Sequence, residues 1–124
     1  MNCQEIFDKV ATHLLTQNKK ALEGSFCSYL TTDGLKCAVG CIIPDGHPAQ
    51  FSSGGLYTIT KAYTDLFALW KMTYGSREYE LLSRLQIIHD SYLPKDWKYR
   101  LLQLTKNPSY NLNPSVVTNW EKES

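Results

Sequence analysis

A chain of 124 residues, 43% of them hydrophobic, is long enough to bury one core and too short for several domains. Thirteen Lys and Arg balance twelve Asp and Glu, and a net charge of +1 excludes a nucleic-acid polymer as the expected partner. There is no export signal and no apolar run of membrane-spanning length. We therefore expect a single cytoplasmic domain over residues 1–124 with no membrane partner.

The first predicted element is an amphipathic helix over residues 3–22. Asn2 suits the N-cap, and Glu5 three positions later completes a capping-box pattern. Apolar residues then recur at helical spacing, at Ile6, Val10 and Leu14. Glu23-Gly24 is typical of a helix stop, so we expect the helix to end there.

A β-hairpin is the second predicted element. Two apolar, β-prone runs, residues 26–30 and 35–43, flank Asp33-Gly34, and this dipeptide is a strong short-range hairpin signal. A short helix over residues 36–43 is the alternative interpretation.

The register of this hairpin decides where three thiols point, because side chains alternate between the two faces. With a two-residue loop, Cys37 and Cys41 share one face and Cys27 lies on the other. With a three-residue loop, all three thiols share a face. In the helical alternative, Cys37 and Cys41 again lie on one face, at positions i and i+4.

Residues 44–56 are rich in Pro, Gly, Ser and Asp, and they predict a long surface loop. Three helical patterns follow. The first runs from Tyr57 to near Tyr74, the second is capped by Ser76, and the third begins at Pro94. The chain as a whole predicts a mainly α (α+β) fold, with three to five helices and one small β-hairpin or Cys-containing turn.

The cysteines raise the question of a metal site. Cys27, Cys37, Cys41 and His47 could supply four zinc ligands, but their C-x9-C-x3-C-x5-H spacing is not that of a zinc finger or knuckle. The segment that holds Cys37 and Cys41 is apolar, as a buried core segment is. We expect these thiols to be buried, reduced and metal-free, with no cofactor, and zinc on these four residues is the alternative.

Catalysis by a thiol would need a neighbouring base, for which His89 and Asp90 are the candidates. Consecutive helical side chains point about 100° apart, so we do not expect these two to pair with each other. No motif of known catalytic mechanics is present. The sequence therefore favours a protein without catalytic residues over an enzyme.

Eight tyrosines, four phenylalanines and three tryptophans are many for this length, so some aromatic rings must reach the surface. Exposed rings and a long loop are both typical of binding surfaces. If the ligand is a nucleotide, cationic side chains would bind its phosphates and aromatic rings would stack on its base. The expected ligand-binding residues are Lys36, His47, Phe51, Tyr57 and Lys61.

Three segments carry a family resemblance: Cys27-Ser28-Tyr29, the GLKCAVGCxIPD-type stretch from Gly34 to Asp45, and Leu85-Gln86-Ile87-Ile88-His89-Asp90. They resemble a family of small proteins of bacteria and their phages to which no activity is assigned. The resemblance implies no catalytic residues. By analogy with phage proteins, it implies a counter-defence or host-modulating protein in the cytoplasm of the bacterial host cell.

We therefore expect a non-enzymatic binding protein that sequesters a small molecule, such as a signalling nucleotide, or docks on a host protein. A zinc-stabilised module or a small Cys/His-dependent enzyme is the alternative. A structural subunit is a third interpretation, and a homo-oligomer is compatible with each of them.

Overall fold

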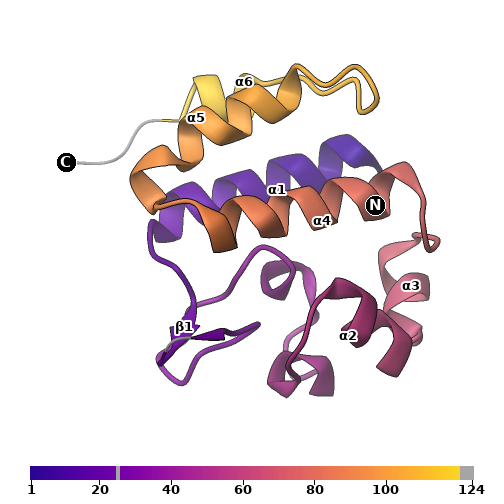
Figure 1. Ribbon diagram of the computed structural model, residues 1–124. Coiled ribbons are helices and arrows are strands. Elements are labelled where there is room, and N and C mark those ends of the chain that lie inside the picture. The colour runs from indigo at the N-terminus through magenta and orange to yellow at the C-terminus, as the bar shows by residue number, and fades with distance from the viewer. Residues whose placement is uncertain (25, 121–124) are drawn as a thin grey trace.

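The computed structural model describes residues 1–24 and 26–120. Its helices are α1 (Cys3–Gln17), α2 (Leu56–Ala62), α3 (Asp65–Trp70), α4 (Arg77–Ser91), α5 (Pro94–Thr105) and α6 (Ser115–Thr118), with 3-10 turns η1 (Gly40–Ile42) and η2 (Pro48–Phe51) (Figure 1). Two short antiparallel strands, β1 (Leu22–Glu23) and β2 (Phe26–Cys27), form a hairpin. The expected fold class, mainly α with a small hairpin, is confirmed.

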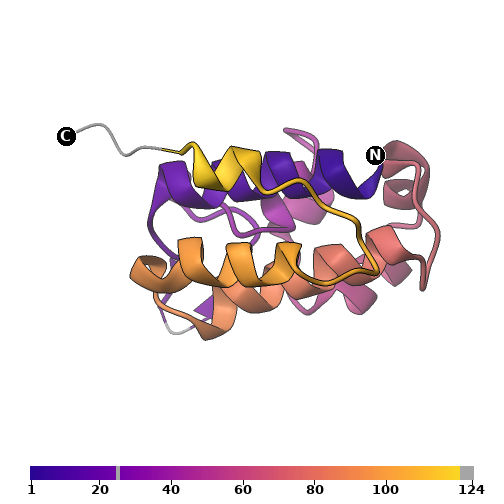
Figure 2. The same ribbon diagram turned by 90° about the horizontal axis from the view of Figure 1, so that it is seen from above.

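The long helices form a bundle. Helices α1, α4 and α5 pack together, and α6 lies against α1 and α5. In Figure 1, α5 and α6 lie above α1 and α4, and Figure 2 shows them from above. The hairpin lies below one end of this bundle, and α2 and α3 lie below the other end (Figure 1). No helix in the described part of the chain is long and apolar enough to cross a membrane.

The core lies between the helices of this bundle, because each of them turns an apolar stripe inward. Fully buried side chains come from α1, α4, α5 and α6: Ile6, Val10, Leu14, Leu82, Leu85, Trp97, Leu101 and Val117. The helical spacing of Ile6, Val10 and Leu14 therefore identified core-facing positions of α1 correctly.

The capping box of α1 is confirmed: Asn2 accepts a hydrogen bond from the Glu5 backbone N–H, and the Glu5 carboxylate accepts one from the Asn2 N–H. The helix ends at Gln17, five residues earlier than predicted. Asn18 takes the left-handed conformation with φ +52°, which asparagine tolerates at a helix end. Gly24, expected to stop this helix, lies instead in the turn of the hairpin with φ +63°.

The hairpin predicted around Asp33-Gly34 is wrong. These residues do form a tight turn, with Thr31 N–H donating to Leu35 O at 2.8 Å, but no strands flank it. The side chain of Gln17 on α1 accepts from the backbone N–H of Lys36 and donates to its carbonyl, at 2.9 Å each. Helix α1 therefore satisfies backbone groups that a strand ladder would have used.

Neither hairpin register of the thiols occurs, and the helical alternative is closer to the structure. Cys41 N–H donates to Cys37 O at 3.1 Å, one helical turn that leads into η1. The actual strands pair Leu22 with Cys27, which puts Cys27 in a different element from the other two thiols.

Two corrections concern residues 44–74. The helix predicted from Tyr57 to Tyr74 is broken at Tyr63-Thr64 into α2 and α3. The predicted surface loop contains η2, where Ala49 and Gln50 are buried. Ser76 and Pro94 do begin α4 and α5, as expected.

Candidate functional site

One cluster joins the hairpin to the C-terminal end of α4. Ligand atoms of Cys27, His89 and Asp90 lie within 4.8 Å of one another, and no other His, Cys, Asp and Glu side chains within residues 1–24 and 26–120 gather in this way. His89 is fully buried, and its Nδ1 lies 2.8 Å from Asp90 Oδ1. The expectation that these neighbours could not pair is therefore wrong: the two side chains bend toward each other at the end of the helix.

The hydrogen bonds of this cluster fix the state of the His89 ring. The backbone N–H of Ala21 donates to His89 Nε2 at 3.0 Å, so Nε2 is an acceptor and the ring proton sits on Nδ1. Nδ1 then donates to Asp90. A histidine that binds a metal uses one nitrogen as the ligand and donates the other N–H to an acceptor. Here the second nitrogen faces a donor, and the donor set does not fit a metal ion.

The Asp90 carboxylate accepts hydrogen bonds from several side chains of this cluster. Burial opposes ionisation of this carboxyl, but hydrogen bonds from His89, Cys27 and Gln86 outweigh it and lower the pKa of Asp90. Gln86 Nε2 reaches Asp90 at 2.8 Å, and Gln86 Oε1 accepts the Val39 N–H at 2.8 Å. The cluster thus ties the hairpin and the segment before η1 to α4.

The thiols do not have the character of nucleophiles. Burial, reinforced by the hydrogen bond to Asp90, raises the pKa of Cys27 to about 11. Burial raises the pKa of Cys37 and of Cys41 to about 12. Because the thiolate is the reactive form, side chains that hold their protons this firmly are poor nucleophiles at neutral pH. We interpret the cluster as a structural network.

The four residues of the alternative zinc set do not converge. Cys37 is buried, and its sulfur accepts the Gly40 N–H. The Cys41 thiol donates to the Ala38 carbonyl. His47 is engaged elsewhere, with Nδ1 accepting the Ala49 N–H and Nε2 2.7 Å from Asp65.

Three of the five predicted ligand-binding residues lie outside the pocket that the other two line. Lys36 forms an ion pair with Asp45 at 2.8 Å. His47 caps η2 and contacts Asp65, as described above. Phe51, the last residue of η2, is 76% exposed.

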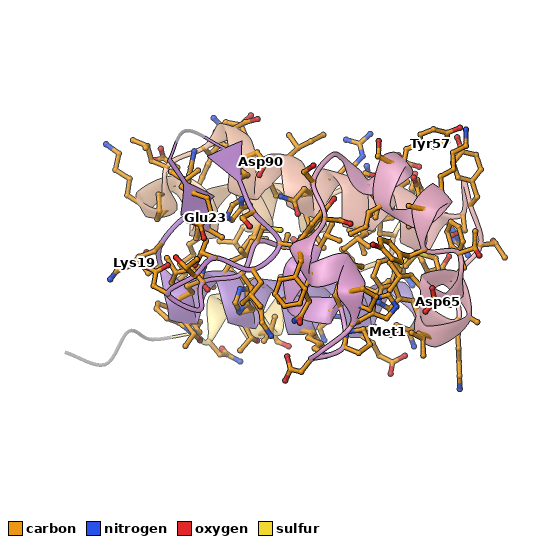
Figure 3. The ribbon with its side chains drawn as sticks, turned by 90° about the horizontal axis from the view of Figure 1, so that it is seen from below. Met1, Lys19, Glu23, Tyr57, Asp65 and Asp90 are labelled. Carbon is orange, nitrogen blue, oxygen red and sulfur yellow. The ribbon has the colours of Figure 1, made fainter. Side chains whose placement is uncertain are left out.

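Tyr57 and Lys61, the other two, line a pocket of about 320 Å³ at the end of the molecule formed by α2 and α3. We call it the aromatic pocket, and its lining is Tyr57, Thr60, Lys61, Thr64, Phe67 and Tyr74. Figure 3 shows Tyr57 at the end of this face opposite Glu23, which marks the hairpin. The aromatic pocket is thus separate from the Cys27 cluster.

The aromatic pocket presents ring faces and one cation. Tyr57 and Tyr74 are 55% and 65% exposed, and their ring centroids lie 5.9 Å apart. Tyr74 also packs on Tyr79 of α4 at 5.2 Å, which supports its position. Lys61, one helical turn after Tyr57, holds its Nζ 5.7 Å from the centre of the Tyr57 ring.

Sequence reasoning missed Phe67 and Tyr74 as members of this site. Phe67 is only partly buried and lines the aromatic pocket. The break at Tyr63-Thr64 folds α3 back beside α2, and no local pattern indicates this. The signal for Tyr74 is the high number of aromatic residues in the chain, since some of these rings must reach the surface.

No known family model matches this chain, and comparison with curated proteins and with solved structures likewise gives no match.

Proposed function

We propose that this protein binds a small, planar, anionic ligand in the aromatic pocket, and that a nucleotide is the ligand class. The observation that carries the proposal is the exposed pair Tyr57 and Tyr74 around a pocket that also holds Lys61. Large aromatic side chains left in water beside a concave surface are typical of binding sites, because burying them there is favourable.

The chemistry of the lining supports stacking more than reading of a base edge. The Thr60 side chain is buried, and its hydroxyl already donates to the Leu56 carbonyl at 2.8 Å. Ring faces contribute about 1–3 kcal/mol per stacked base and tolerate different bases. Lys61 supplies a positive charge for a phosphate. Sequestration of a signalling nucleotide needs no further chemistry, in keeping with a binding protein.

The test is calorimetric titration with adenosine monophosphate, adenosine and inorganic phosphate. We expect the monophosphate to bind best, because it alone offers both a ring and a negative charge. Tyr57→Ala and Tyr74→Ala should each weaken binding about tenfold or more, since each removes a stacking face. Lys61→Gln should weaken the binding of the monophosphate and leave the binding of adenosine unchanged.

Phe51→Ala is the matched control for the tyrosine variants. Phe51 is also an exposed ring, but it lies outside the aromatic pocket. Its removal should leave affinity unchanged. Undiminished binding in both tyrosine variants, or equal loss in the Phe51 variant, would show that the aromatic pocket is not the binding site.

A further inference from the structure

A second concave site lies between α4 and α5, away from the aromatic pocket. These helices run antiparallel, joined by a short turn (Figure 1), and between them is a groove of about 290 Å³. We call it the arginine groove. Its lining includes Arg84, Ile88 and Tyr92 from the α4 side and Arg100, Gln103 and Leu104 from α5, with no acidic residue.

Arg100 is a cation held in place without a counter-charge from residues 1–24 or 26–120. Its guanidinium carbon lies 4.0 Å from the centre of the Tyr92 ring and 5.5 Å from that of Tyr99. Its Nε is buried with no hydrogen-bond partner, and no acidic side chain in the described residues pairs with it. Buried polar atoms are normally satisfied, so an orphan donor beside a groove points to an absent acceptor.

Arg84 brings a second guanidinium to the same groove. Its Nε contacts Glu80 at 3.2 Å, one helical turn away, and the side chain is half exposed. Both arginines line the groove, so an anion bound there would meet two guanidinium groups. Between them the wall is apolar, with Ile88 buried and Leu104 partly buried.

We propose that the arginine groove is a binding site for a small anion whose carboxylate or phosphate group is carried on an apolar body. The planar guanidinium fork pairs with either group through two parallel hydrogen bonds, which a lysine cannot do. Stacking on Tyr92 fixes the plane of the fork before the ligand arrives. Ile88 and Leu104 then contact the apolar body. This site is independent of the nucleotide proposal.

The experiment is an amide NMR titration of the full chain with phenyl phosphate, phenylacetate and inorganic phosphate. Phenyl phosphate and phenylacetate should give saturable shifts at the arginine groove, and their relative affinities tell which anionic group it prefers. Inorganic phosphate should bind at least tenfold more weakly, because it has no apolar body. Equal affinity for inorganic phosphate would overturn the role given to the apolar wall.

Arg100→Gln should weaken the binding of phenyl phosphate about tenfold or more. Arg100→Lys should restore only part of this affinity, because lysine returns the charge without the planar guanidinium fork. Arg84→Gln provides a second variant that leaves the Tyr92 stack intact, and it should also weaken binding. Lys95→Gln is the control, with the same charge change at an exposed position of α5 outside the groove. Equal affinities across these variants, or shifts confined to the aromatic pocket, would overturn the proposal.

Discussion

Gly40 shows how closely single residues are constrained around the thiols. A Cβ placed on Gly40 would lie 2.0 Å from the carbonyl oxygen of Tyr29, far inside van der Waals contact. The obstacle is backbone, which cannot rotate away as a flexible side chain can. Tyr29 is itself fixed, because its buried ring sends its hydroxyl to the Gly54 carbonyl. Only glycine lets the segment after Cys37 approach this closely.

Gly40→Ala should therefore lower the free energy of unfolding by about 2–3 kcal/mol, the cost of forcing an extra methyl group into a packed interior. Urea denaturation followed by circular dichroism gives this value. Gly55→Ala is the matched control, since Gly55 has φ −79° and nothing within 4 Å of an added Cβ. A Gly40 variant as stable as the Gly55 variant would contradict the close approach.

The Cys27 thiol offers a second test at the same scale. Loss of water around the sulfur and the hydrogen bond to Asp90 raise the pKa of Cys27 to about 11, so little thiolate exists at pH 8 although the residue as a whole is exposed. Asp90→Asn removes the negative charge beside the sulfur and should speed alkylation of Cys27 about tenfold. Peptide mapping after timed iodoacetamide treatment measures it. An unchanged rate would mean that Asp90 does not control this thiol.

At the scale of elements, the helices are delimited by their caps and held by their buried faces. Helix α1 contacts α4, α5 and α6, so it is the central element of the bundle (Figure 2). Its capping box satisfies backbone N–H groups that would otherwise lack partners at the first turn. Tertiary packing carries most of its stability, and the cap adds a smaller, local contribution.

Asn2→Ala should cost about 1 kcal/mol of stability, the usual value for losing an N-cap side chain. Thermal and urea unfolding both report it. Asn119→Ala is a suitable comparison, because Asn119 is exposed and lies at the C-terminal end of α6. A loss at Asn119 equal to that at Asn2 would argue against a specific capping effect.

At the scale of the whole molecule, the buried thiols make the free energy of unfolding depend on pH in the alkaline range. Burial raises the pKa of Cys37 and of Cys41 to about 12, whereas an unfolded cysteine titrates near about 8.5. The folded state therefore keeps protons that the unfolded state releases. The stabilisation that comes from these protonated thiols is therefore fully present below the pKa of the unfolded state. It is lost as the pH rises toward the pKa of the folded state.

The free energy of unfolding should fall above about pH 8.5, at up to about 1.4 kcal/mol per pH unit for each buried thiol. Urea unfolding at a series of pH values from 7 to 11 measures the slope. Cys37→Ala removes one titrating group and should make the slope shallower, whatever its effect on stability at pH 7. An identical slope in wild type and variant would refute the linkage.

Local patterns in the sequence predicted the buried face of α1 and the starts of three helices. The apolar spacing of Ile6, Val10 and Leu14 predicted the buried face of α1, and the chemistry of Asn2, Ser76 and Pro94 predicted three helix starts. These succeed because a helix period and a cap each involve residues within a turn or two of one another.

Contacts between segments far apart in the chain could not be predicted from local patterns. The Asp33-Gly34 turn has hairpin chemistry, but Gln17 of α1 takes the backbone groups of Lys36, and the strands form elsewhere. Tyr57 and Lys61 were among the predicted ligand-binding residues, and they lie one helical turn apart on α2. Tyr74 joined them only through the fold, because its place depends on contacts with Tyr57 and Tyr79. Pairings of this kind are set by packing of the whole chain, which no local pattern encodes.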